Sequence, residues 1–358
     1  MKRERVIVGL LVALVLAACG TTASSGGSSY QGKTIKLGAL LSITGAGGVY
    51  GPQSRDGMKL AVEQINGSGG VNGAQIDLEV RDDASDKAQS AQQAQTMIQQ
   101  DQLMALLGPT LSNSAVGVHP LAENLKTPIL AVSTTGIHIV PDCNFPSTAP
   151  CKYVFRDSLG EQTAIPDNIK AYSDDKHPAS GVLLVAQDDK FSSDGGQIVQ
   201  DTVSKYNINL LKVIKFSKTE ADLSPYVTQA VQLKPDVIFI TSLGGIPAKI
   251  MIEARKQGWT GQFLGGNGFN TATVSKQAGK SGEGARSASA WYIGNTFASN
   301  ADFVSRDKLR AAMETVNIDT PLGPFQFTSN HDVKQTVWVI QMDGNGGFSL
   351  VHEIKPTT

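Results

Sequence analysis

The sequence carries no surplus of charge of either sign. Its 358 residues include 31 basic and 32 acidic side chains, which leaves a net charge of -1. A protein that binds nucleic acid through the phosphates needs a basic surface to release the condensed counterions. The balanced charge therefore argues against nucleic acid as a partner.

Common catalytic motifs are missing as well. The chain has no G-x-S-x-G nucleophile elbow, no H-E-x-x-H zinc motif, no P-loop and no C-x-x-C pair. Its five histidines are scattered, and we interpret them as surface or packing residues: His119, His138, His177, His331 and His352. Because no set of nucleophile, base or metal ligands can be assembled from these residues, we expect no enzyme, no metal site and no cofactor.

Cysteine is scarce, with three in the chain, and the first follows an apolar leader. Basic residues precede the run VIVGLLVALVLAA, which is too short for a spanning helix but has the pattern of a signal peptide. The run ends in LAAC, which resembles the bacterial lipobox, where the cysteine is lipidated and becomes the mature N-terminus. We therefore predict a lipoprotein signal peptide over residues 1–18 and lipidation of Cys19. An ordinary secretory signal with a chance cysteine is the alternative.

The following residues, 19–33, are rich in Gly, Ser and Thr and are expected to form a flexible tether. The body would then be extracytoplasmic and lipid-anchored to the cell membrane, in a compartment that permits disulfides. With Cys19 lipidated, Cys143 and Cys151 in PDCNFPSTAPC remain, and we predict that they pair. Closing so short a loop should contribute about 2–3 kcal/mol. A metal site is the weaker interpretation, since no histidine lies close on this loop.

From Thr34 onward, short apolar runs alternate with amphipathic stretches. The first series predicts strands at TIKLGALL, AQIDLEV, LMALLG and PILAV, with helices over 52–65, over 86–100 and from about Ser112. A second series follows YVFRDS and predicts strands at GVLLVAQ, LLKVIKF, DVIFITS and GQFLGG, with helices over 193–206, 221–233 and 246–257. Repeated strand and helix units predict an α/β fold with two Rossmann-like, doubly wound parallel-sheet lobes.

The loops that follow the predicted strands should share one edge of each sheet and line a cleft between the lobes. One of them, LSITGAGGVYG, suggests a dinucleotide fingerprint, with Gly45 and Gly47 in place. Tyr50 occupies the position of the third glycine, however, and the acidic residue expected about 20 positions later is absent. Because an exported chain also meets no dinucleotide pool, we do not favour this alternative.

Hydroxyl side chains follow two of the predicted strands. Ser112 and Ser114 stand where a strand gives way to a helix, and Ser133, Thr134 and Thr135 follow the next strand. Together with free N–H groups of a first helical turn, such hydroxyls can bind a carboxylate or another anion. The alternative is that they merely cap helices.

Apolar side chains from both lobes should complete this cleft. Tyr50, Phe191 and Leu243 are the candidates, although each alone is more often a core residue than a ligand contact. Asp188 and Asp189 lie beside Lys190, and we interpret this pair as a solvated face rather than as cleft acids.

The stretch from Ile35 to Asp86 closely resembles the start of the branched-chain amino-acid type of periplasmic binding protein, the substrate-binding component of ABC importers. The resemblance continues through LLGPTLSNSA, TPILAVSTTG, YVFRDS, DVIFITSLGG and EARKQGWTGQFLGGNGF, and so covers most of the chain after residue 34. It implies the type I periplasmic binding fold, in which two lobes joined by three crossing strands close on a small molecule. The implied lobes are 34–157 plus 294–331 and 158–293 plus 332–358.

The resemblance also implies ligand contacts by position. First-lobe donors correspond to Ser114 and the 133–135 stretch beside Tyr50, and second-lobe contacts to Phe191, Leu243 and Asn267. Members that bind α-amino acids usually hold the ammonium with an acidic side chain at the position of Asn267, and an amide cannot supply that charge. Ile137 similarly stands where a hydroxyl is common. We therefore expect a ligand with a carboxylate or amide and no obligatory ammonium.

A second departure from the family concerns length. After WYIGNTFASNADFV the family usually continues through several tens of residues, including a long helix, before the motif seen here as RDKLRAAMETV. Either a natural deletion or a faulty gene model would produce the join near 304–307. Because the lost helix would belong to the first lobe, we predict an exposed apolar patch and reduced stability there.

The function that the resemblance implies is ligand capture by hinge closure. The expected partners are a small molecule, the permease subunits that recognise the closed form, and the membrane through the lipid anchor; the protein itself is expected to be a monomer. A sensory ligand-binding protein of the same fold, which presents its closed form to a receptor, is the alternative function.

Overall fold

The computed structural model describes residues 30–137, 151–290, 314, 317–320, 323–328 and 331–356. The predicted signal peptide, Cys19, most of the tether, Cys143 and the join near 304–307 lie outside these residues. Cys151 is buried and disulfide-bonded, and its pairing with Cys143 stays a prediction. Within the described ranges, no helix combines the length and the apolar character needed to cross a membrane.

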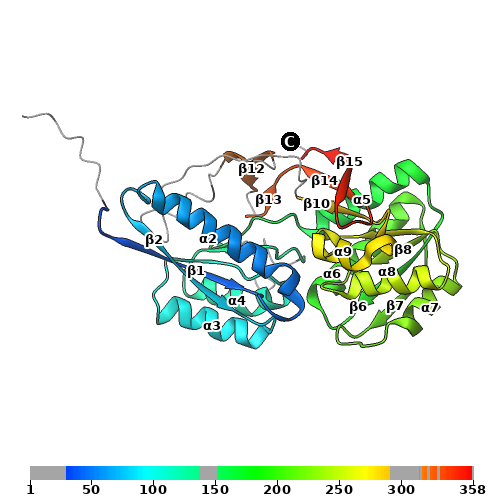
Figure 1. The fold of residues 1–358 in the computed structure, drawn as a ribbon, viewed down its shortest axis with the longest axis horizontal. Helices are drawn as coiled ribbons and strands as arrows, with labels where there is room; N and C mark the ends of the chain where they lie inside the picture. Colours follow the sequence, from blue (N-terminus) through cyan, green and yellow to red (C-terminus); the bar gives the residue numbers. More distant parts are fainter. Residues whose placement is uncertain are drawn as a thin grey trace, which may run out of the picture.

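The chain forms two lobes, each built around its own sheet (Figure 1). The sheet of the first lobe has the strand order β2-β1-β3-β4-β5, and all its neighbouring strands are parallel. Its strands are β1 (Thr34–Leu41), β2 (Gln75–Asp82), β3 (Ala105–Leu107), β4 (Ile129–Ala131) and β5 (Val154–Arg156). Its helices are η1 (Gly45–Val49), α2 (Gly51–Gly67), α3 (Lys87–Gln99) and α4 (Ser112–Asn124).

Successive residues of β1 point to opposite faces of this sheet. Leu40 is fully buried in a cluster that includes Met97 of α3 and Val118 of α4. On the other face, Leu41 packs with Met58 of α2, which is only partly buried. Helices therefore cover both faces of the sheet, as the alternating pattern predicted.

The sheet of the second lobe has the order β15-β14-β10-β9-β8-β6-β7. Its strands are β6 (Ser180–Ala186), β7 (Asn209–Phe216), β8 (Val237–Ile240), β9 (Gln262–Gly265), β10 (Arg286–Ser289), β14 (Val337–Met342) and β15 (Phe348–Ile354). The strands from β6 to β10 pair in parallel, whereas β14 and β15 are antiparallel additions at one edge. The predicted α/β fold is confirmed, with a second sheet that is mixed rather than purely parallel.

The helices of the second lobe are α5 (Glu161–Lys176), α6 (Lys190–Val203), α7 (Ser224–Gln232), α8 (Ile246–Lys256) and α9 (Ala272–Ala278). The sequence placed the start of α6 at residue 193. The helix begins three residues earlier because the Asp189 carboxylate accepts a hydrogen bond from the Ser192 N–H and so caps the first turn. The sequence pattern had not indicated α5, which carries Pro166 in its interior.

Two chain segments that pass between the lobes lie side by side and are joined by Arg156. This residue ends β5 and is fully buried, and its Nε donates to the Asp332 Oδ1 at 2.8 Å. Asp332 immediately precedes β13 (Val333–Lys334), which pairs with β12 (Gly323–Phe327) and, through it, with β11 (Asn317–Thr320). The guanidinium also donates to the carbonyl oxygen of Gly136 at 3.0 Å. The third predicted crossing strand, after β10, falls outside the described residues.

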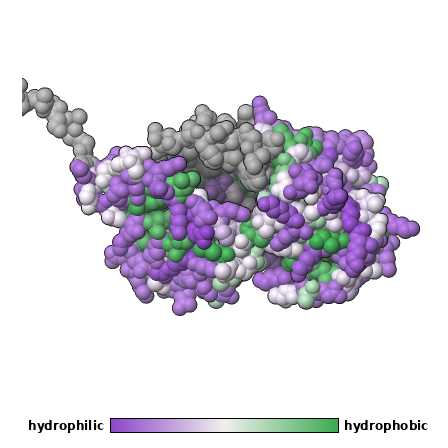
Figure 2. Space-filling model, viewed as in Figure 1, coloured by the Kyte–Doolittle hydropathy of each residue, from purple (hydrophilic) through white to green (hydrophobic). Residues whose placement is uncertain are grey.

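Apolar side chains are exposed on the outer face of α2. Gly51 is the one buried residue of this 17-residue helix, while Leu60 is 55% exposed and Ile65 39% exposed. Figure 2 shows hydrophobic surface gathered on the first lobe in this view. The apolar patch expected from the shortened segment near 304–307 stays a prediction, because that segment lies outside the described residues.

Replacing both Leu60 and Ile65 by Ser should cost less than about 1 kcal/mol of unfolding free energy, because neither side chain is buried. The same change should lower the fluorescence of a dye that binds apolar surface. Urea unfolding and dye titration measure the two effects. As a control, Leu40→Ala in the core should cost about 2–5 kcal/mol. A loss of that size in the double variant would show that the outer face of α2 is covered in solution.

Candidate functional site

The carboxyl ends of the strands in the two lobes bring their loops together. The first lobe contributes the loop between β1 and α2, the start of α4 and residues 133–136 after β4. The second lobe contributes the start of α6, residues 241–245 after β8 and residues 266–270 after β9. In open α/β sheets, this edge is where ligands bind.

Hydrogen bonds cross directly from one lobe to the other. The Asn113 Nδ2 of α4 donates to the Asp189 Oδ2 at 2.6 Å, and its Oδ1 accepts from the Lys190 N–H at 2.8 Å. We refer to these two bonds as the Asn113 bridge. The hydroxyl of Tyr50 donates to the carbonyl oxygen of Gly268 at 3.3 Å. The lobes are thus in contact through their strand-end loops, in a closed arrangement.

Asp189 is a buried acid at this boundary, so its interpretation as part of a solvated face was wrong. It caps α6 and meets Asn113, and its exposed fraction is 7%. Burial raises the pKa of Asp189, against the opposing effect of the Ser192 N–H that donates to it. Asp188, by contrast, is exposed and accepts from the Lys218 N–H. A charged pair in sequence cannot show that one member turns inward to cap a helix.

The predicted donor hydroxyls have partners within the protein. Ser112 Oγ accepts from the Gly136 N–H at 3.1 Å, and Thr134 Oγ1 donates to the carbonyl oxygen of Pro109 at 2.7 Å. Ser114 Oγ is fully buried and donates to the Asp83 Oδ2 at 2.9 Å. These bonds hold the loops of the first lobe in place, and the ligand roles of these residues stay predictions.

The loop over residues 133–136 reaches the lobe boundary through Thr135. Ser133 is partly buried and has a φ of +67°, so the backbone turns sharply there. Two residues later, Thr135 Oγ1 donates to the Glu161 Oε1 at 3.3 Å. Among the five predicted hydroxyls, Thr135 therefore bonds to the second-lobe helix α5.

Two of the predicted apolar residues, Tyr50 and Phe191, lie near Gly268. Tyr50 is 8% exposed and Phe191 is 3% exposed, and Leu243 is partly buried. A Cβ atom at Gly268 would lie 3.6 Å from the Phe191 ring, on the residue whose carbonyl accepts from Tyr50. Burial raises the pKa of the Tyr50 hydroxyl well above its usual range. The structure thus brings together the first-lobe and second-lobe aromatics that the sequence had proposed for one cleft.

Glu161 is the acid that the sequence analysis missed. It is the first residue of α5 and is fully buried. Its Oε1 accepts from the backbone N–H of Asn267 at 2.9 Å, from the Asn267 Nδ2 at 2.8 Å and from Thr135. Its Oε2 is buried and has no hydrogen-bond partner. An acidic residue in the first turn of a helix is so common that its sequence gives no sign of a special role.

Burial is the largest influence on the Glu161 carboxyl and raises its pKa to about 7. The hydrogen bonds from Asn267 and Thr135 and the charge of Arg156 act in the opposite direction but do not offset the lost solvation. The Arg156 guanidinium is already paired with Asp332. Glu161 therefore sits near neutral pH between its protonated and ionised forms.

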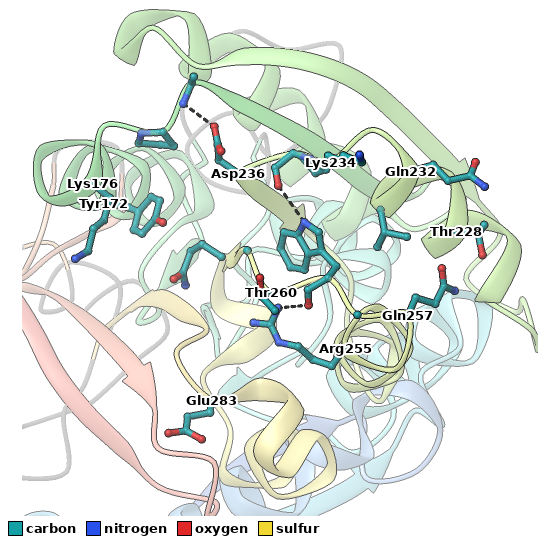
Figure 3. Close-up of a pocket in the computed structure, with 18 of the residues that line it drawn as sticks. Tyr172, Lys176, Thr228, Gln232, Lys234, Asp236, Arg255, Gln257, Thr260 and Glu283 are labelled. Carbon is teal, nitrogen blue, oxygen red and sulfur yellow. Dashed lines mark hydrogen bonds between the residues drawn. The ribbon is translucent and has the colours of Figure 1, made fainter.

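A large hollow lies elsewhere, beside the amino ends of β6, β8 and β9 (Figure 3), and has a volume of about 1210 Å³. Its polar groups bind neighbouring backbone. Asp236 accepts from the Ala179 N–H at 2.8 Å, Trp259 Nε1 donates to the Pro235 carbonyl at 3.0 Å, and Arg255 donates to the Trp259 carbonyl at 2.8 Å. These bonds hold the local loops, and we assign the hollow no ligand.

Comparison with known proteins identifies the family. The periplasmic binding protein family matches residues 34–306. The chain belongs to this family. The Leu/Ile/Val-binding protein of Escherichia coli K12 is 23% identical over 270 residues, which cover 75% of this chain and 71% of that protein. A leucine-, isoleucine-, valine-, threonine- and alanine-binding protein of Pseudomonas aeruginosa is 24% identical over 267 residues, or 73% of this chain and 68% of that protein.

Solved structures of binding proteins share the fold. A leucine-binding protein of Thermotoga maritima has a TM-score of 0.80 at 20% identity and covers 90% of this chain and 99% of its own. A binding protein of Rhodopseudomonas palustris, solved with 3,4-dihydroxybenzoic acid, has a TM-score of 0.77 at 16% identity, with coverage of 91% and 98%. The expected type I fold is confirmed. Membership of this binding-protein family implies a place outside the cytoplasm and a role other than catalysis.

The raised pKa of Glu161 predicts how stability depends on pH. The folded protein holds a proton that the unfolded chain releases between the ordinary value of 4.5 and about 7. The free energy of unfolding should therefore fall as pH rises through this window, by about 3 kcal/mol at most from this group, and level off above it. Glu161→Gln should remove that part of the dependence and gain stability relative to the native protein as pH rises.

Urea unfolding at pH 5 and pH 8 measures this difference. Glu63→Gln, the same change on an exposed residue of α2, serves as the control and should follow the native protein at both pH values. Burial also raises the pKa of Asp157 to about 7. The free energy of unfolding of Glu161→Gln should therefore still fall to some extent as pH rises. Equal pH dependence in the native protein and Glu161→Gln would contradict the buried state of this carboxyl.

Proposed function

We propose that the protein is the substrate-binding lipoprotein of an ABC importer, which captures a small ligand between its lobes by hinge closure. The observation that carries this proposal is that loops at the carboxyl ends of both sheets meet through the Asn113 bridge and Tyr50. A site made from two lobes exists only when they close, so ligand binding and closure are coupled. The closed form is the one that a membrane permease would recognise.

The location and the covalent features belong to the same proposal. The signal peptide over 1–18, lipidation of Cys19 and the tether over 19–33 would hold a monomeric body at the outer face of the membrane. The disulfide of Cys151 would be with Cys143. The first lobe would comprise 34–157 plus 294–331, and the second 158–293 plus 332–358.

The ligand is proposed to be a small amino acid or aromatic acid. Support comes from the Leu/Ile/Val-binding relatives and from solved neighbours that hold isoleucine or 3,4-dihydroxybenzoic acid. The proposed contact residues are Tyr50, Ser112, Ser114, Ser133, Thr134, Thr135, Phe191, Leu243 and Asn267. Tyr50 and Phe191 would cover the apolar part of the ligand, because both lie near Gly268 at the lobe boundary.

A sensory protein of the same fold is the second candidate function. It would use the same closure but present the closed form to a receptor. Genes for permease and ATPase subunits beside this one would favour transport, while a neighbouring kinase or cyclase would favour sensing.

Native mass spectrometry of the purified protein should detect one small molecule bound per chain, and calorimetry with that molecule should give a single site. Phe191→Ala should then weaken binding by about 10- to 100-fold, because the ligand loses an apolar wall. Leu211→Ala, on an exposed residue of β7, is the matched control and should bind as the native protein does. Absence of any ligand, co-purified or added from a panel of amino acids and aromatic acids, would contradict the proposal.

Asn113→Ala tests the closure itself. The variant loses both bonds of the Asn113 bridge, so the closed form should become less populated and ligand affinity should fall by roughly 10-fold. X-ray scattering should show that more ligand is needed to reach the compact form. Asn124→Ala, an exposed residue at the other end of α4, is the control. Unchanged affinity in Asn113→Ala would show that the bridge does not stabilise the ligand-bound state.

A further inference from the structure

We propose that residues 135–137 form a latch on the second lobe, with Ile137 as its apolar anchor and Lys190 as the residue that holds it. The latch favours the closed form without touching the ligand, so it sets the strength of binding rather than the choice of ligand. Ile137 and Lys190 are thus positioning residues. The inference rests on the proposed function, because it names residues that control the closure of that site.

The first observation is an apolar contact that crosses from one lobe to the other. Ile137 follows β4 of the first lobe, yet its side chain packs against a core cluster of the second lobe. That cluster includes Ile165 of α5 and Val199 of α6, which are both buried. Because the partners belong to different lobes, the apolar surface that they remove from water stabilises the closed arrangement. The position at which a hydroxyl is common in the family therefore carries an interlobe contact here.

The second observation is that a lysine of the second lobe holds the backbone of Ile137. Lys190 is the first residue of α6, and its Nζ donates to the carbonyl oxygen of Ile137 at 3.3 Å. The same Nζ donates to the Asp194 Oδ1, one turn further along α6, at 2.6 Å. The two side chains of this ion pair are 21% and 9% exposed. The ammonium is therefore fixed at the lobe boundary, and its bond to the Ile137 carbonyl is assisted by charge.

The third observation is the close fit of the two residues before Ile137. The Glu161 N–H, at the start of α5, donates to the carbonyl oxygen of Thr135 at 2.8 Å. A Cβ atom at Gly136 would lie 2.8 Å from the Asp194 Oδ2 and 3.0 Å from the Ser112 Oγ, so the backbone passes closely between α4 and α6. The latch thus runs along the second lobe from the start of α5 to α6.

A latch of this kind changes affinity through the population of the closed form. The apparent affinity of a ligand falls in proportion to the fraction of the protein that is in the binding-competent form. Loss of the latch lowers that fraction by the same factor for every ligand. Loss of a direct ligand contact weakens different ligands unequally, because each places a different group there.

The first test measures closure without any ligand. Spin labels at Lys59→Cys in α2 and Lys249→Cys in α8, two exposed positions, report the distance between the lobes in the full chain. Ile137→Ser should shift the distances toward longer values and lower the ratio of closed to open protein about 10-fold. Ile137→Val retains most of the apolar contact and should stay close to the native protein.

Leu210→Ser is the matched control for this shift. Leu210 of β7 is partly buried against the same core cluster, but it lies within the second lobe. The change should therefore lower stability without altering the distance between the lobes.

The second test is calorimetry of the full chain with L-leucine, L-isoleucine and benzoate. Ile137→Ser should weaken each probe that the native protein binds by the same factor of about 10, and so keep their order. Lys190→Met keeps the apolar stem but loses the ammonium, and should weaken them equally by about 3- to 10-fold. Lys170→Met is its control, because Lys170 forms the equivalent pair with Asp174 on the exposed face of α5.

Unchanged distances between the lobes in Ile137→Ser would overturn the latch. A changed order of the probes at unchanged distances would show that Ile137 contacts the ligand, which overturns it as well. If Ile137→Ser does not fold, the distances in Lys190→Met decide in its place. If no probe binds, the distances in these variants still decide on the latch, whereas the proposed function is decided separately by native mass spectrometry of bound ligand.

Discussion

The buried ion pair between Arg156 and Asp332 is the interaction on which the arrangement of the two lobes depends. It joins the segment that leaves the first lobe after β5 to the segment that enters β13, so two crossings between the lobes stay side by side. The same guanidinium donates to the carbonyl oxygen of Gly136, next to Thr135. One side chain thus holds both the hinge and a loop of the site. A fully buried guanidinium needs such partners, because an unpaired charge there would be strongly destabilising.

Glu161 lies five residues beyond Arg156 in the sequence. Burial raises the pKa of its carboxyl, and the charge of Arg156, which is paired with Asp332, acts in the opposite direction without offsetting the burial. The acid then bonds to one loop from each lobe. Closure of the lobes and the charge of the site are in this way properties of one connected set of side chains.

Much of the fold could be predicted from the chain alone. The apolar runs of β1, β6 and β8 stand where the strands form, and the loops that follow them meet at the lobe boundary. Local sequence patterns are enough to predict these strands and loops, because the spacing of apolar residues and the choice of turn residues involve only positions close in sequence. The antiparallel strand β14 was harder to predict, since it pairs with β10 across about 50 positions of the sequence, and β15 joins the sheet only by pairing with β14. The chemistry of the site was harder still. Ser114 offers a hydroxyl in the expected place but bonds to Asp83, and Asp189 turns inward as a cap. These two outcomes and the role of Glu161 depend on which side chains are buried together. A sequence pattern does not contain that information.

The central claim is that burial at the closed lobe boundary raises the pKa of Glu161. Carbon-13 nuclear magnetic resonance of the glutamate carboxyl groups, assigned by comparison with Glu161→Gln, measures this directly as pH is varied. The protein should show one glutamate carboxyl that titrates with a pKa near 7. A Glu161 signal that titrates near the ordinary 4.5 would contradict the account.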